Sequence, residues 1–122
     1  MYQKIAVWLD SILNQEIPEP VVAFCFNLYE DGENQWSLEL VGTESFDEEG
    51  EDWACDEVTD FGSRENNIIW NSSSECDEVL EEIVTDVKRY LENGKYADVL
   101  KAKKGVGVGF VDGDIEIVYT GR

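Results

Sequence analysis

Apolar residues recur along the first third of the chain at two different spacings. Over residues 2–14 they lie three and four positions apart, which predicts an amphipathic helix. Over residues 21–29 and 35–41 they alternate with other residues, and Asp31-Gly32 between these runs is a typical turn sequence. The pattern therefore predicts a helix followed by a β-hairpin with one strongly apolar face.

The longest amphipathic pattern covers residues 74–93 and predicts a second helix that stops at Gly94. Two capping boxes are available at its start: Ser72 with Glu75, and Ser74 with Asp77. The remaining predicted elements are a short strand at 66–71, a short helix at about 96–103, and a second hairpin at 105–119 that turns at Asp112-Gly113-Asp114.

This order of elements is typical of an α+β fold. We expect one mainly antiparallel sheet, built from two hairpins plus a short strand, with helices packed on one face. The residues expected to face the sheet from the second helix are Val79, Ile83, Val87 and Tyr90. No linker or repeat divides the sequence, so residues 1–122 are predicted to form a single domain.

The net charge of the chain indicates which kinds of partner it can bind. The chain has 28 acidic and nine basic residues, and its formal net charge is −19. Nucleic acids and anionic membrane surfaces are unfavourable partners, because binding them depends on Lys and Arg. A basic protein is the favoured partner.

Cysteine usage and hydropathy predict the compartment. Three cysteines without a CxxC pair support neither a disulfide framework nor a zinc ribbon, and we expect reduced thiols. No run of residues is long and apolar enough for a membrane span. A cytoplasmic protein is therefore expected.

The residue inventory argues against most enzyme chemistry. The chain contains no His, which removes the common Ser–His and Cys–His pairs and His-ligated metals. The glycines in GVGVG follow a predicted helix within a β-run, so they indicate close packing by a helix or a neighbouring strand rather than a phosphate loop. DEEGEDWACDEV does not match an EF-hand. We expect no enzymatic activity, no cofactor and no metal; a small enzyme using carboxylates or a metal is the rival class.

The segment ESFDEEGEDWACDEVTDF, residues 44–61, is the main candidate for function, because nine of its 18 residues are acidic and none is basic. Such a segment suits a surface that binds a basic protein, with Trp53 as an aromatic anchor at its centre. Two alternatives are a solvated face that maintains solubility, and a Trp53 that packs the segment onto the core. The predicted partner-binding residues are Glu44, Asp47, Glu48, Glu49, Glu51, Asp52, Trp53, Asp56, Glu57 and Asp60.

The DWACDEVTDF segment and the GVGVGFVDGDIEIVY hairpin, in a small acidic chain, resemble the immunity proteins of bacterial polymorphic-toxin and contact-dependent inhibition systems. The resemblance implies a protein that binds a cognate toxin domain, often a basic nuclease, and blocks its active site or groove. It assigns no site residue. The alternative within binding proteins is a nucleic-acid mimic or adaptor that acts on a host DNA- or RNA-binding protein.

Overall fold

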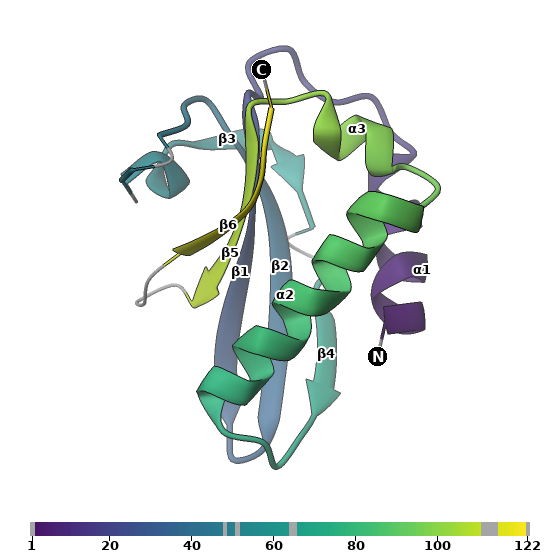
Figure 1. The fold of residues 1–122 in the computed structure, drawn as a ribbon, viewed down its shortest axis with the longest axis vertical. Helices are drawn as coiled ribbons and strands as arrows, with labels where there is room; N and C mark the ends of the chain where they lie inside the picture. Colours follow the sequence, from purple (N-terminus) through teal and green to yellow (C-terminus); the bar gives the residue numbers. More distant parts are fainter. Residues whose placement is uncertain (1, 48, 51, 64–65, 111–114, 122) are drawn as a thin grey trace.

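The computed structural model describes residues 2–47, 49–50, 52–63, 66–110 and 115–121, with only the backbone described at 52, 55 and 59–61. Figure 1 shows a sheet with α-helices on one side of it. In chain order the elements are α1 (Tyr2–Leu13), β1 (Ala23–Gly32), β2 (Gln35–Thr43), the 3₁₀ helix η1 (Asp52–Cys55), β3 (Glu57–Gly62), β4 (Ile68–Asn71), α2 (Cys76–Asn93), α3 (Ala97–Lys101), β5 (Gly105–Phe110) and β6 (Ile115–Thr120).

The sheet has the order β3-β2-β1-β5-β6, and β4 also pairs with β2. All of these pairs are antiparallel except β1 with β5, which are parallel because the chain crosses over through α2 and α3 before it enters β5. The predicted α+β fold with a mostly antiparallel sheet is therefore confirmed. Among the described residues, no helix combines the length and apolar character needed to cross a bilayer.

The larger hydrophobic core lies between the sheet and the helices. Phe24, Phe26 and Leu28 of β1 are fully buried there, as the alternating pattern predicts. The predicted helix residues also enter this core: Val79, Ile83, Val87 and Tyr90. Trp8 of α1 is buried as well, and its indole N–H donates to the Asn66 carbonyl oxygen at 2.5 Å.

The ends of α2 differ in detail from the predicted caps. The N-cap is Glu75, whose backbone N–H donates to the Glu78 carboxylate at 3.2 Å, so neither serine box forms. The helix ends before Gly94 as predicted. Gly94 itself has a φ of −71°, so it does not adopt a left-handed conformation. Gly94 is required by space instead, because a Cβ there would lie 2.5 Å from the Tyr90 ring.

The first hairpin turns two residues later than predicted. Gly32 pairs with Gln35, so the turn residues are Glu33 and Asn34, and Asn34 adopts φ 60°. The predicted turn residue Asp31 is instead the extra residue of a bulge in β1. The second hairpin pairs β5 with β6 as expected, and its predicted turn at 112–114 lies outside the described residues.

Two further elements depart from the prediction. β3 falls inside the acidic segment, where no strand was expected, and α3 is shorter than the predicted helix at 96–103. β3 and β4 pair with different parts of the same edge of β2, and Ser63, which follows β3, bonds to Leu40 between those parts. Its hydroxyl accepts the Leu40 N–H at 2.9 Å and donates to Asn67 Oδ1 at 2.7 Å.

Candidate functional site

The acidic segment folds into a loop followed by a strand. We call residues 44–56 the acidic loop; it contains η1 and leads into β3. Of the predicted partner-binding residues, Glu44, Asp47, Glu49 and Asp56 are exposed and Glu57 is half-buried, whereas Trp53 is buried. Glu48 and Glu51, and the side chains of Asp52 and Asp60, lie outside the described part of the structure. Four of the predicted carboxylates are thus exposed along this loop.

The acidic loop is closed by hydrogen bonds between its two ends. The Glu44 N–H donates to the Asp56 carbonyl oxygen at 2.9 Å, and Ser45 Oγ lies 2.5 Å from Asp56 Oδ2. Within the loop, Asp47 Oδ1 accepts the Glu49 N–H at 2.9 Å. A loop whose ends meet and whose side chains pack within it has the character of an Ω-loop. The carboxylates of Glu44, Asp47, Glu49 and Asp56 therefore project from backbone that these contacts hold.

Trp53 holds the acidic loop against the sheet. Its side chain is 3% exposed and packs with Ala23, Cys25 and Val41 in a second, smaller core. The Phe46 ring meets it edge-on, with 4.9 Å between ring centroids. Of the two roles the sequence allows for Trp53, this burial fits packing onto the core, and a partner cannot reach the ring without displacing the loop.

The glycines of β5 make the space that these two aromatic rings occupy. A Cβ at Gly105 would overlap the Phe46 ring, and one at Gly107 would lie 3.0 Å from Trp53 Cζ2 and 2.7 Å from Ile115 Cγ2. The expected close packing at GVGVG is present. The packing partners, however, are the aromatics of the acidic loop together with the neighbouring strand, and not a helix.

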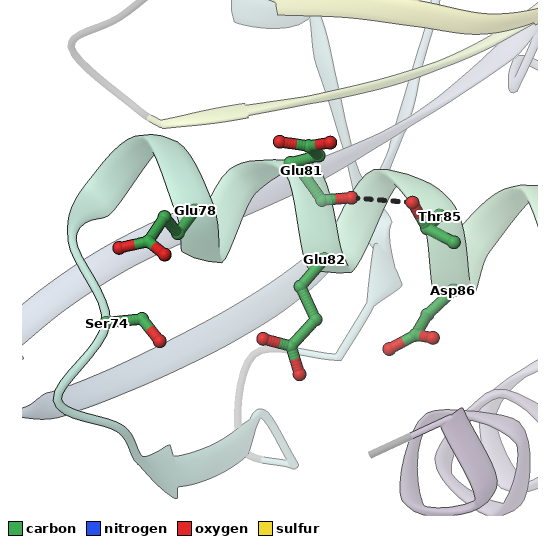
Figure 2. A pocket seen from close by; sticks show the side chains of 6 residues that line it. All are labelled: Ser74, Glu78, Glu81, Glu82, Thr85 and Asp86. Carbon is green, nitrogen blue, oxygen red and sulfur yellow. Dashed lines mark hydrogen bonds between the residues drawn. The ribbon is translucent and has the colours of Figure 1, made fainter.

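A second acidic surface lies on α2, and the sequence analysis did not select it. Ser74, Glu78, Glu81, Glu82, Thr85 and Asp86 line a shallow pocket along this helix. In Figure 2 the side chains of Glu78, Glu82 and Asp86 point to one side of the helix and Glu81 points to the other. The signal was available in the sequence, because Glu78, Glu82 and Asp86 are spaced four apart on a helix whose buried face was correctly predicted.

Asp86 is a partly buried carboxylate of the α2 surface. Its Oδ2 atom is buried and has no hydrogen-bond partner among the described residues. Burial raises the pKa of Asp86, the Glu82 charge raises it further, and Arg89 opposes this shift. A carboxyl group with a raised pKa is a starting point for acid–base chemistry. The pocket around it is otherwise lined by carboxylates and hydroxyls only.

The other reactive groups are dispersed. Cys25 is buried beneath the acidic loop, and Cys76 is exposed at the first turn of α2. Within the described residues no group of three or more His, Cys, Asp or Glu side chains is arranged to hold a metal ion. Among the described residues, the candidate sites are therefore the two carboxylate-bearing surfaces, on the acidic loop and on α2.

The chain matches no protein-family model, no curated protein sequence and no solved structure.

Proposed function

We propose that this protein is a non-enzymatic binding protein that recognises a basic partner protein through its exposed carboxylates. The supporting observation is the construction of the acidic loop, which is closed on itself and packed onto the sheet by Phe46 and Trp53. The exposed carboxylates that the structure describes on this packed loop are Glu44, Asp47, Glu49 and Asp56. Ordering these charges before binding reduces the entropy lost on association.

The most concrete form of this proposal is an immunity protein that acts in the cytoplasm on a toxin, with a basic nuclease as the expected class. Its carboxylates would occupy the cationic groove in place of nucleic-acid phosphates, and the toxin would be inhibited by occlusion. Lys and Arg side chains pair well with carboxylates, and the long-range field of a chain with net charge −19 speeds the encounter. The resemblance to immunity proteins and the charge of the chain both support this form.

Burial of Trp53 changes which residues we assign to the binding surface. An aromatic residue that is 3% exposed contributes to binding by holding the loop in place and not by direct contact. The carboxylates outside the described part, Glu48, Glu51, Asp52 and Asp60, remain members of the proposed surface because they belong to the same segment.

Isolation of the partner tests the proposal. The tagged protein is purified from its native host at low ionic strength, and any protein that elutes when salt is raised is identified. The proposal predicts a partner with an excess of Lys and Arg, and the immunity form further predicts that the isolated partner is toxic unless this protein is co-expressed. Recovery of an acidic or neutral partner, held equally well at high salt, would contradict charge recognition.

A further inference from the structure

β6 forms an open edge of the sheet. It is last in the strand order, and within the described residues no strand pairs with its outer side (Figure 1). An edge strand directs alternate backbone N–H and C=O groups outward, where they can pair with an added strand. Natural proteins protect such edges with charged side chains, especially Lys, with Pro or with bulges; β6 contains neither Lys nor Pro, and its charged side chain is Glu116.

A bulge limits the regular part of this edge. Val106 pairs with Tyr119 and Gly107 with Ile117, so Val118 is an extra residue on β6. Before the bulge, residues 115–117 follow regular antiparallel pairing with β5. An added strand would therefore have its regular partners at 115–117.

A groove runs beside this part of β6. It holds about 460 Å³ between α2 and β6, which contact each other. Its floor is apolar, because Val84 is buried and Leu80 is half-buried. The carboxylates that line it are all exposed: Asp77, Glu81 and Glu116. The basic residue among its lining residues is Lys88.

The two faces of β6 present different chemistry to an added strand. Glu116 pairs with Val108, a residue of the larger core, so its side chain lies on the helix side of the sheet next to the groove. Ile117 lies on the opposite side and packs against the core beneath the acidic loop. A strand added here would meet carboxylates on one face and apolar side chains on the other.

We propose that the β6 edge and the adjoining α2 groove bind an extended segment of the basic partner by strand addition. Lys or Arg would occupy alternate positions, with their aliphatic stems over Leu80 and Val84 and their charged ends at Asp77, Glu81 and Glu116. Apolar residues would occupy the positions between. A second copy of this chain is a poor occupant, because each copy carries a net charge of −19. This inference rests on the proposed function and adds the mode of binding.

The test uses a short peptide of alternating Lys and Val and two N-methylated derivatives of it, which carry equal numbers of methyl groups and are isomers of each other. One isomer carries N-methyl groups on the backbone nitrogens of the Val residues, and the other carries them on the Lys residues. Residues alternate in which edge of a strand their backbone groups face, so each isomer blocks one hydrogen-bonding edge only. Binding is followed by backbone amide chemical shifts up to about millimolar peptide, a concentration at which weak association is still measured.

Strand addition predicts that the unmodified peptide and one isomer bind, with shifts centred on residues 115–118 and α2, while the other isomer binds at least about tenfold more weakly. Glu116→Lys should weaken binding about tenfold, and Glu92→Lys, an exposed control on the same helix as the groove, should change it less than about threefold. Equal binding of both isomers, no binding of the unmodified peptide, or shifts confined to the acidic loop would overturn the inference.

The two proposals fail separately. If a basic partner depends on the exposed carboxylates but the peptide shows no edge preference, strand addition is wrong and charge recognition stands. If the peptide binds at β6 while the native partner proves acidic or neutral, the edge accepts strands but the proposed function is wrong.

Discussion

Trp53 shows how a side chain in the most acidic part of the chain comes to be buried. Its ring lies over Gly107 and against Phe46, so its environment is set by a strand more than 50 residues away in the sequence. Local composition could not reveal this contact, because the acidic residues on either side are equally compatible with an exposed anchor. The glycine run at 105–109 also indicated this contact, because it leaves space for a large side chain. That Trp53 fills the space follows only from the sheet topology.

Truncation of Trp53 separates a packing role from a contact role. Trp53→Ala should lower the free energy of unfolding by about 3–5 kcal/mol, because it removes the largest side chain of the second core. Urea denaturation measures this loss, and Trp53→Phe should lose less because a ring remains. Unchanged stability together with a large loss of partner affinity would show instead that Trp53 acts at the interface.

The raised pKa of Asp86 predicts how the stability of the fold changes with pH. Because burial raises its pKa above 3.8, the folded state binds this proton more tightly than the unfolded chain does. The ionised carboxylate therefore lowers the free energy of unfolding at neutral pH. This loss begins to decrease as pH falls through the raised pKa, and it is absent once pH is well below 3.8. Asp86→Asn should raise the melting temperature at pH 7 and leave it nearly unchanged at pH 3. The exposed control Glu92→Gln should show no such difference, and a lower melting temperature for Asp86→Asn at pH 7 would contradict the account.

At the scale of elements, hydrophobic periodicity predicted the helices and strands whose apolar residues repeat regularly. The predicted stripe of α2 and the predicted alternation in β1 and β2 were correct because each element turns one continuous apolar face to the larger core. The opposite face of β1 and β2 is buried as well, at Ala23, Cys25 and Val41, which the alternation did not predict. The turn was misplaced because Asp31-Gly32 is a typical turn sequence, yet the register absorbs Asp31 as a bulge. β3 was missed because its pairing with β2 is short and interrupted, and its acidic residues do not resemble a strand.

The contact between the acidic loop and β5 can be tested from the strand side. Gly107→Ala should destabilise the fold by about 1–3 kcal/mol, because the added methyl group would lie 3.0 Å or less from Trp53 and Ile115. Gly32→Ala is the matched control, since nothing lies within 4 Å of a Cβ there, and it should change stability by no more than about 1 kcal/mol. Urea denaturation compares the two. Equal effects would mean that the loop does not pack on β5 as described.

At the scale of the whole molecule, the dominant property is charge. Carboxylates are exposed both on the acidic loop and on α2, and the excess of like charge opposes the folded state. The net charge can be counted from the sequence, but the distribution of the carboxylates over two surfaces cannot. The α2 surface depends on which face of a helix remains uncovered, and packing decides that.

Salt should therefore stabilise the protein. Screening reduces the repulsion among carboxylates, so the melting temperature should rise between low and moderate ionic strength. Thermal unfolding followed by circular dichroism over a series of NaCl concentrations measures this. A melting temperature that fell steadily as salt was added would mean that attractive ion pairs outweigh the repulsion.

The association rate constant with the isolated partner tests charge recognition most directly. Asp47→Asn, Glu49→Gln and Asp56→Asn together remove three exposed charges, and the Asn side chains retain an oxygen for the loop hydrogen bonds. The matched control removes three exposed charges elsewhere: Glu16→Gln, Glu19→Gln and Glu33→Gln. Stopped-flow measurement should show a rate at least about tenfold lower for the loop variant, with a weaker salt dependence, and a smaller change for the control. Equal rates for the parent and the loop variant would contradict a binding surface at the acidic loop.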